Sequence, residues 1–506
     1  MLGDTAMIIE EKQKMNRSAW TTLTVLSCLG LVTLYGETMV LPAIPDFIRD
    51  FNISYNTSSW ILSAFLIAGA VMTPIAGKLS DIYGKKRILL IIMAVYSTGL
   101  LAGGFANSIE FMLAARVAQG IGFSMFPIAF GIIRETLPIQ KLAMGQTIFG
   151  STFSGGAVVG LLVGATIIQN YGWHFTFLSV FPVAVILALI IKKFIHVKYP
   201  LDSNVPGVAR AEEDANGMIS KSIDLKGTVA LASTVISFLA GISLLENSIA
   251  ESVVGLDIAG LFAVATISLG SFLVIERRAS VPLIDLKLMT NKMLLSATII
   301  LMLVGLCTFM VYQTIPIMIR SPKPFGFGGD PIVTANVQLP FMIILLLGTI
   351  GSGFVLNRVG NLKLTILGTV VGTIGFFSLF AFHSSELMVA ITLSIIAAGL
   401  SLSFTGGFNI VLVSVPMQAT GIALGMTLLL NLIGQSIGPT VAAIFQQTYQ
   451  GAVEGVAGRF PTAEAYSLIF ATAAVLSLTS VVLALLLRRG HQITPSIDTT
   501  AGGSTH

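Results

Sequence analysis

The chain has 506 residues, of which 54% are hydrophobic and only 10% are charged. Its mean hydropathy of +0.90 excludes a water-soluble globular protein of this length. It predicts apolar side chains both in the protein interior and on a surface that contacts lipid. The net charge of +4 then gives no argument for nucleic-acid binding. Because Cys28 and Cys307 both fall in apolar runs, we expect neither a disulfide nor a metal site.

Fourteen apolar runs are long enough to cross a bilayer, and helices are the structure that satisfies the backbone there. The first 19 residues are polar, and the run after them reaches Pro42 without a cleavage site of small residues. It is therefore predicted to be a retained span and not a signal peptide. The runs lie near residues 20–43, 57–77, 88–107, 109–133, 142–168, 174–192, 227–246, 256–275, 293–317, 332–356, 362–382, 387–415, 420–446 and 465–487.

Two long joints between the runs predict how the chain is divided. Residues 193–226 mix both charge signs with prolines, as a solvated linker does, and residues 276–292 form an amphipathic joint. We expect a cytoplasmic tail (1–19), a six-helix bundle (20–192), the cytoplasmic linker (193–226), an inserted two-helix hairpin (227–275), the amphipathic joint (276–292), a second six-helix bundle (293–487) and a cytoplasmic tail (488–506).

The distribution of cations predicts the orientation. With the N-terminus in the cytoplasm, only Arg49, Arg320, Lys323 and Arg459 of the 28 lysines and arginines lie outside, and only Arg116 lies within a span. Cytoplasmic loops carry such an excess of cations. We therefore predict an all-α integral membrane protein with 14 spans, arranged as six, two and six, and with both termini in the cytoplasm.

Residues 77–87, GKLSDIYGKKR, join the second and third runs. The joint combines two glycines, which allow tight turns, with a carboxylate that needs a helix N-terminus or a cation as partner, and with several cations. It resembles the G-x-L-a-D-r-x-G-r-k signature of major facilitator superfamily transporters, in which this joint helps to hold the inward-closed state. The alternative is an ordinary basic loop. The residues that match are Gly77, Asp81, Gly84, Lys85 and Arg87, and Ile82 replaces an Arg of the signature.

The two halves of the chain repeat each other weakly, as the halves of transporters do. Span five contains Gly156, Gly160 and Gly164 at four-residue spacing, and span thirteen contains Gly434 and Gly438. Small residues at this spacing predict a helix face on which another helix packs closely. Residues 351–363 are a worn copy of the joint at 77–87, with Asn in the place of Asp81.

Further motifs resemble one branch of that superfamily, the 14-span drug:proton antiporters. YGETMVLPAIP (35–45) is similar to its D-x-T-x-x-x-x-A-L-P signature, with Glu37 in place of Asp, and YGWHFTFLSVFP (171–182) to its G-W-R-W-x-F-x-x-x-x-P. In span five, Leu161 and Ala165 replace a Pro and a Gly of the antiporter signature. Span four matches R-x-x-Q-G-x-G through Arg116, Gln119, Gly120 and Gly122.

This resemblance implies a major facilitator fold and a secondary active transporter in the plasma membrane. It implies a proton-coupled antiporter of the multidrug efflux type that exports small amphiphilic or cationic compounds by alternating access. We expect no cofactor, since the proton gradient drives transport, and a monomer whose partners are its substrate, protons and lipid. An importer or facilitator of a small metabolite, or a membrane sensor or scaffold that has lost transport, are the alternatives.

Glu37 and Arg116 are the clear ionisable residues within the predicted spans. At 1.5 Å per residue both lie roughly 9–11 Å below the outer surface. In the superfamily the spans that carry them face one cavity, where their charges would offset each other's desolvation. Glu37 is then a candidate for proton coupling and for anchoring a cationic substrate. The alternatives are a static ion pair for Glu37 and a helix-packing donor role for Arg116.

Within the predicted spans of the second half, away from their ends, the polar side chains are all uncharged, and they either hold helices together or contact a substrate. With three aromatic side chains of the first half they form a predicted lining for a large amphipathic pocket. The chain shows no Gly-rich phosphate cradle and no metal-ligand spacing, so an enzyme or an ATP-driven pump is not expected. The predicted lining residues are Tyr35, Phe65, Phe126, Gln313, Gln338, Asn409, Asn431 and Gln435.

Overall fold

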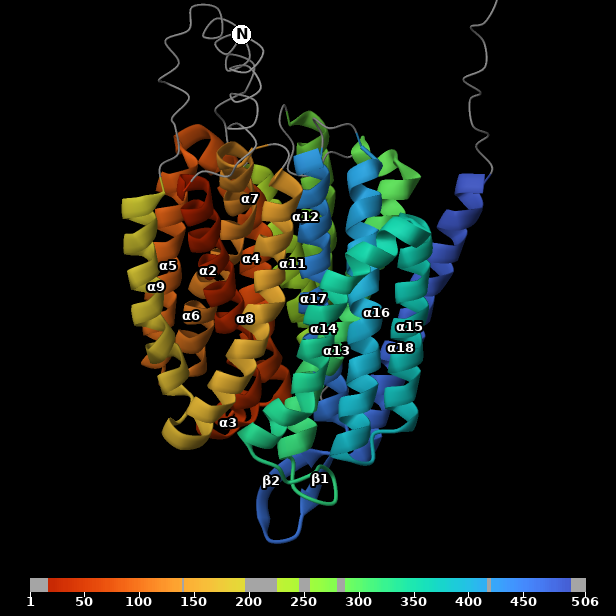
Figure 1. Cartoon of the computed structure of the whole chain (residues 1–506). Coiled ribbons are helices and arrows are strands. Elements are labelled where there is room, and N and C mark those ends of the chain that lie inside the picture. The colour runs from red at the N-terminus through yellow and green to blue at the C-terminus, as the bar shows by residue number, and fades with distance from the viewer. Residues whose placement is uncertain are drawn as a thin grey trace, which may run out of the picture.

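A computed structural model describes residues 17–138, 141–195, 225–244, 255–279, 287–415 and 420–492. Within this part of the chain, thirteen helices are long and apolar enough to cross a membrane. They stand side by side in one bundle, with the first half of the chain on one side and the last third on the other (Figure 1).

The first half of the chain forms a bundle of long helices with short helical pieces at their ends. Its elements are α2 (Arg17–Thr38), η1 (Leu41–Ala43), α3 (Ile44–Asp50), α4 (Tyr55–Tyr83), α5 (Lys85–Gly104), α6 (Ile109–Ile121), η2 (Gly122–Ser124), α7 (Met125–Thr136), α8 (Leu142–Tyr171) and α9 (His174–Phe194).

Two helices, α11 (Leu225–Leu244) and α12 (Gly255–Arg278), follow as a pair packed on each other. The second bundle then consists of η6 (Leu288–Thr290), α13 (Lys292–Arg320), α14 (Pro331–Val359), α15 (Asn361–Ala381), α16 (Glu386–Val413), α17 (Thr420–Thr448) and α18 (Ala463–Gln492). Between α17 and α18 the chain forms an antiparallel hairpin of β1 (Gln450–Val453) and β2 (Val456–Pro461), which pairs Gln450 with Pro461.

The thirteen spans differ from the predicted fourteen at α11. Its apolar part within the described residues, Lys226–Gly241, is shorter than the thirteen others, and the end of the predicted span 227–246 lies outside the described residues. Also outside them lie residues 1–16, 139–140, most of the predicted linker (196–224), part of the predicted amphipathic joint (280–286) and residues 493–506. The β hairpin was not predicted, because hydropathy carries no signal for a short polar hairpin between two spans.

Local chemistry explains where helices begin and turn. Ser54, Ser108, Asp330 and Ser385 each accept a hydrogen bond from the backbone N–H three residues on, which satisfies a free donor of the first turn. Gly84 and Gly360 have φ of +93° and +81°, and each forms the turn between two long helices at the same place in its half. The repeat predicted for residues 77–87 and 351–363 is therefore visible in the backbone.

The surface of the bundle is apolar, as contact with lipid requires. Large hydrophobic side chains such as Ile267 (68% exposed), Phe354 (73%) and Leu387 (68%) point outward. So large an apolar surface would aggregate in water, so the bilayer is the solvent in which this fold is stable.

The two halves meet along two pairs of helices, α4 with α17 and α8 with α14. One apolar cluster is built from both halves and includes Leu161 and Ala165 of α8, the two departures from the antiporter signature. The α11–α12 pair lies beside the α4–α17 seam, where Leu231 and Val235 pack with Ile67 of the first half and Met426 of the second. The inserted pair thus contacts both halves at their boundary.

Candidate functional site

Arg116 lies on α6 at the centre of a buried hydrogen-bond network. Its side chain is fully buried; Nε donates to the carbonyl of Ile61 (3.0 Å), and Nη1 donates to the carbonyl of Gly36 (3.3 Å) and to Oε1 of Gln119 (2.8 Å). Gln119 in turn donates to the carbonyl of Gly99 (2.8 Å). The two side chains therefore connect α6 to α2, α4 and α5. One nitrogen of Arg116, Nη2, has no partner among the described residues.

The carboxylate of Glu37 lies next to this network but does not join it. Glu37 is 4% exposed, and no hydrogen bond or ion pair to its side chain occurs among the described residues. The charges of Glu37 and Arg116 attract each other electrostatically without direct contact. Arg116 instead binds the carbonyl of Gly36, directly beside Glu37. The sequence predicts that Glu37 and Arg116 lie at one site. In the structure, Arg116 is hydrogen-bonded to the backbone carbonyl of the residue before Glu37 and not to the carboxylate.

Tyr312 lies on α13 in the second bundle. It is 8% exposed, and its buried hydroxyl has no hydrogen-bond partner in the described part of the chain. Its ring lies 5.6 Å from the ring of Phe309 and 6.0 Å from that of Phe341. Gln338 donates to the carbonyl of Tyr312 (3.3 Å), and its Oε1 is without a partner among the described residues. The second bundle thus contains an aromatic cluster with unused polar atoms beside it.

Tyr312, Phe309 and Phe341 were missed by sequence reasoning, which selected Gln313 and Gln338 as the polar residues of these helices. Aromatic residues are common in membrane helices, so their type alone gives no signal. The ring of Tyr312 on α13 meets that of Phe341 on α14 only through the packing of the two helices, which the tertiary structure decides.

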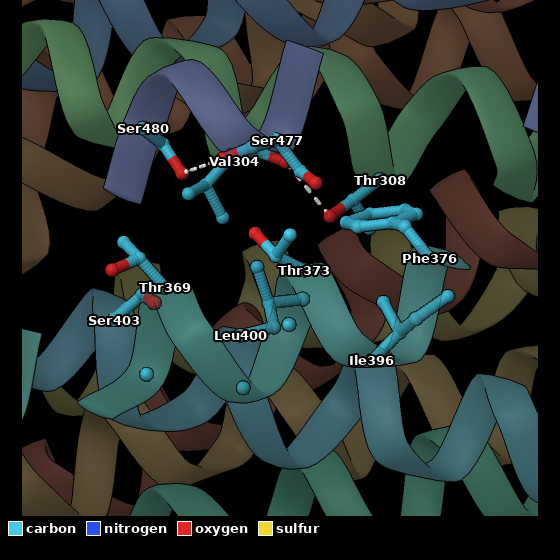
Figure 2. A pocket seen from close by; sticks show the side chains of 13 residues that line it. Val304, Thr308, Thr369, Thr373, Phe376, Ile396, Leu400, Ser403, Ser477 and Ser480 are labelled. Atoms are coloured by element: carbon cyan, nitrogen blue, oxygen red, sulfur yellow. Dashed lines mark hydrogen bonds between the residues drawn. The ribbon is translucent and has the colours of Figure 1, made fainter. Parts of the chain in front are cut away.

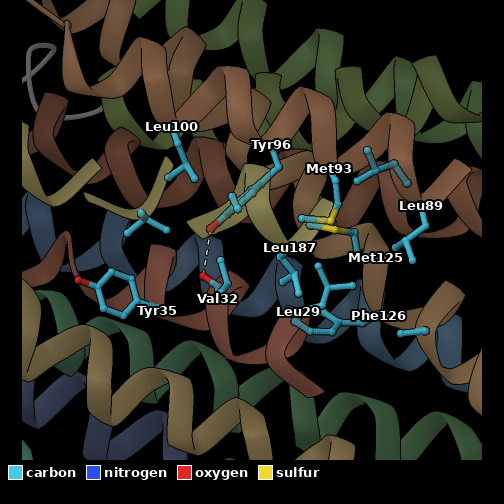
Figure 3. Packing of buried hydrophobic residues seen from close by; sticks show 14 of the residues in the cluster. Leu29, Val32, Tyr35, Leu89, Met93, Tyr96, Leu100, Met125, Phe126 and Leu187 are labelled. Carbon is cyan, nitrogen blue, oxygen red and sulfur yellow. Dashed lines mark hydrogen bonds between the residues drawn. The ribbon is translucent and has the colours of Figure 1, made fainter. Parts of the chain in front are cut away.

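The aromatic residues predicted in the first half occupy different places. Phe65 lies under the Arg116 guanidinium, with 4.2 Å between the Arg116 Cζ and the ring centroid, and packs near Phe309 of the other half. Phe126 stacks edge-on with Phe123 (5.1 Å) inside the first bundle. Tyr35 belongs to the same bundle core, in which the Tyr96 hydroxyl donates to the carbonyl of Val32 (Figure 3). Of the three, Phe65 lies at the boundary of the halves.

The predicted polar residues of the second half also separate. Asn431 donates to the carbonyl of Leu301 (2.8 Å) and accepts from Gln435 (2.7 Å), so this pair joins α17 to α13 within one bundle. Asn409 donates to the carbonyl of Thr405 in its own helix. Gln313 is fully buried, and both of its amide atoms lack partners among the described residues. Gln313 and Gln338 thus retain free polar atoms, whereas Asn431, Gln435 and Asn409 serve helix contacts.

The joint at 77–87 lies at the end of the bundle opposite α3 and the β hairpin (Figure 1). Gly84 makes its turn, whereas Gly77 lies inside α4 with open space where a Cβ would be. Lys85 pairs with Glu135 of α7 (2.6 Å), and Arg87 is exposed. The side chain of Asp81 lies outside what the structure describes, so its predicted partner stays a prediction.

The glycines of the predicted packing motifs face neighbouring helices closely. A Cβ on Gly156 or Gly160 would lie 3.0 Å or less from the backbone of α2, the helix that carries Glu37, and one on Gly164 would lie 2.8 Å from the Cα of Met39, directly after α2. In the other half, a Cβ on Gly438 would lie 2.7 Å from the Met310 nitrogen of α13. In span four, a Cβ on Gly120 would lie 2.9 Å from that of Ala68, and one on Gly122 would meet the ring of Tyr96. Both halves therefore pair their first and fifth spans through glycine.

Contacts between the halves close the end of the molecule that carries the β hairpin. Arg320 at the end of α13 binds the carboxylate of Asp46 in α3 through two nitrogens and donates to the carbonyl of Pro42 (3.0 Å). The backbone N–H of Tyr55 donates to Gln447 (3.2 Å). Ser63 donates to the carbonyl of Ser436 (2.9 Å). With the predicted orientation this is the outer end.

Comparison with known proteins identifies relatives over most of the chain. The family model for the Major Facilitator Superfamily matches residues 26–439. "Multidrug resistance protein 3" of Bacillus subtilis is 24% identical over 77% of this chain and 72% of its own length. The "Tetracenomycin C resistance and export protein" of Streptomyces glaucescens is 24% identical over 86% and 77%. The "Multidrug efflux pump LfrA" of Mycolicibacterium smegmatis is 24% identical over 88% and 84%.

Solved structures share the fold at low sequence identity. The human organic anion transporter MFSD10 matches with a TM-score of 0.62 and 15% identity, over 93% of this chain and all of the other. A D-xylose-proton symporter matches with a TM-score of 0.61 and 12% identity, over 92% and 97%. At these identities the likeness concerns the fold alone.

Proposed function

Because this chain belongs to the major facilitator superfamily, we propose that it is a proton-coupled antiporter that exports small amphiphilic or cationic compounds by alternating access. In this proposal the protein is a monomer in the plasma membrane, with fourteen spans and both termini in the cytoplasm. It needs no cofactor. Relatives that carry names of multidrug resistance and efflux proteins support the export of drug-like compounds.

One observation carries the proposal: the carboxylate of Glu37 is buried, and it has no direct hydrogen-bond or ion-pair partner among the described residues. A charged group at this depth is costly unless a proton or a cation neutralises it. Arg116, held by three acceptors, supplies a nearby positive charge that does not neutralise it by contact. Glu37 is thus available to bind a proton in one state and a cationic substrate in another.

Aromatic residues of both halves favour the same substrate class. Phe65 belongs to the first half, and Phe309, Tyr312 and Phe341 belong to the second. Aromatic faces bind flat apolar molecules and attract cations. The free atoms of Tyr312 and Gln338 offer hydrogen bonds without a second charge. A substrate with an apolar body and one positive charge satisfies all of these groups.

Flux measurement on the purified full-length protein tests this function. In proteoliposomes with an imposed pH gradient, acid inside, we expect fluorescent amphiphilic cations such as ethidium to accumulate in the vesicles. A protonophore should abolish this accumulation, because exchange against protons has lost its driving force. If accumulation is the same with and without the protonophore, transport is not coupled to protons. Accumulation only with acid outside would reject antiport and indicate import by symport.

A further inference from the structure

A small cavity lies inside the second bundle, away from the boundary between the halves. Its volume is about 10 Å³, which is the room that one water molecule needs. Four helices surround it, α13, α15, α16 and α18, and Gly368, Gly372 and Gly399 help to form it. Figure 2 shows its hydroxyl-bearing side chains, which are Thr308, Thr369, Thr373, Ser403, Ser477 and Ser480.

Most of these hydroxyl groups already donate a hydrogen bond. Thr308, Thr369, Ser477 and Ser480 donate to backbone carbonyls of their own helices at 2.6–3.0 Å. A hydroxyl that donates its single proton still has lone pairs with which it accepts hydrogen bonds. The cavity wall is therefore rich in acceptors.

Two hydroxyls of the wall are unused. Thr373 on α15 is 7% exposed and Ser403 on α16 is 1% exposed, and neither oxygen has a hydrogen-bond partner among the described residues. Figure 2 shows the Thr373 hydroxyl pointing into the space between α15 and the helices on the far side. A buried hydroxyl without a partner is destabilising, so each requires a group to bind.

We propose that this cavity is a hydration site that holds an ordered water molecule bound by Thr373 and Ser403. Water is the ligand that fits, because it accepts hydrogen bonds from the two unused hydroxyls and donates to the oxygens whose protons are engaged. An ion does not fit, since all lining side chains are uncharged and the cost of moving a bare charge into such a site is large. The water links the helix pair α15–α16 to α13, on which Thr308 lies one turn before Tyr312.

Isosteric removal of the hydroxyls tests the proposal by the sign of its effect. With a bound water, Thr373→Val and Ser403→Ala each remove a hydrogen bond and lower the thermal unfolding midpoint of the detergent-solubilised protein by about 1–2 °C. In a dry cavity the same substitutions remove an unsatisfied hydroxyl and leave the midpoint unchanged or raise it, which overturns the proposal.

Thr365→Val is the matched control. Thr365 lies two turns earlier on α15, is buried and bonds the Asn361 carbonyl (2.9 Å). Thr365→Val measures how far the unfolding midpoint falls when a bonded threonine of this helix is replaced by valine. The fall for Thr373→Val must be at least as large. A density map of the wild-type protein at high resolution provides the direct measurement. Water density within hydrogen-bond distance of Thr373 Oγ1 supports the proposal, and its absence from a well-ordered map rejects it.

Discussion

Arg320 and Asp46 form an ion pair that joins the two halves of the molecule at one end. Asp46 also binds Arg49 of its own half (3.2 Å). When the halves separate, Asp46 therefore keeps a cationic partner, whereas Arg320 loses the carboxylate. The second arginine lowers the cost of opening, because the buried carboxylate is never left unpaired.

We expect Arg320→Ala to favour states that are open at the outer end. Hydrogen bonds to charged groups contribute about 1.5–3 kcal/mol each, so the open population should rise about tenfold or more. A cysteine at Ser63, which is buried and bonded across the boundary, reports opening in a protein without Cys28 and Cys307. An impermeant thiol reagent should label it faster in Arg320→Ala.

The matched control for this prediction is Arg49→Ala, which removes the other arginine at Asp46. Arg49 has a side chain that is 69% exposed and lies in the same half as Asp46. Its removal should leave the labelling rate of Ser63→Cys the same or lower. Equal acceleration by both variants would mean that the Asp46–Arg320 pair does not hold the outer end.

Glu37→Gln should abolish accumulation of substrate against a gradient and leave downhill exchange intact. Glutamine resembles the protonated carboxyl group in shape and charge, so the variant is fixed in one protonation state. Glu37→Asp keeps the acid and restores the residue of the family signature, and should retain much of the activity. Transport against the gradient by Glu37→Gln, with the wild-type pH dependence, would place proton coupling on another residue.

Arg116→Ala should destabilise the first bundle by about 1–3 kcal/mol or more, because it leaves the buried acceptors on Ile61, Gly36 and Gln119 without their donor. Arg116→Lys keeps the charge but cannot reach all three acceptors, so it should recover only part of the stability. Thermal unfolding in detergent measures both. A wild-type midpoint together with lost transport would show instead that Arg116 acts on the substrate or proton alone.

Gly160→Ala should lower stability by about 1–3 kcal/mol, since the new Cβ would lie 2.7 Å from the Tyr35 carbonyl oxygen. Gly155→Ala is its control on the same helix, because no atom lies within 4 Å of a Cβ there. That substitution should be neutral or stabilising by up to about 1 kcal/mol through helix propensity. If the two variants unfold alike, α8 does not need glycine to approach α2.

Cysteines at Tyr83 and Glu454 should react with an impermeant reagent from opposite sides of the membrane. Tyr83 is 52% exposed at the end of α4, and Glu454 is exposed in the turn between β1 and β2. We expect Tyr83→Cys to react from the cytoplasm. Labelling of both from one side would reject the predicted orientation.

The sequence by itself determined the class of the protein and nearly all of its helices. Apolar runs longer than the bilayer is thick leave the backbone one choice, so the spans agree with the described helices within a few residues. The motif around Gly84 and its copy around Gly360 also predicted two equivalent turns, because only glycine adopts their backbone conformation easily. These features depend on residues that are near one another in the chain.

Only the tertiary structure decided which polar groups are free. Arg116 binds the backbone carbonyls of Ile61 and Gly36 instead of the Glu37 carboxylate. The ion pair between Asp46 and Arg320 joins residues 274 positions apart, and neither belongs to a local motif. Hydropathy and spacing indicate how deep a residue lies in the membrane and on which face of its helix it lies. They do not indicate which helix packs on that face, because the packing of the two bundles depends on contacts between residues distant in sequence.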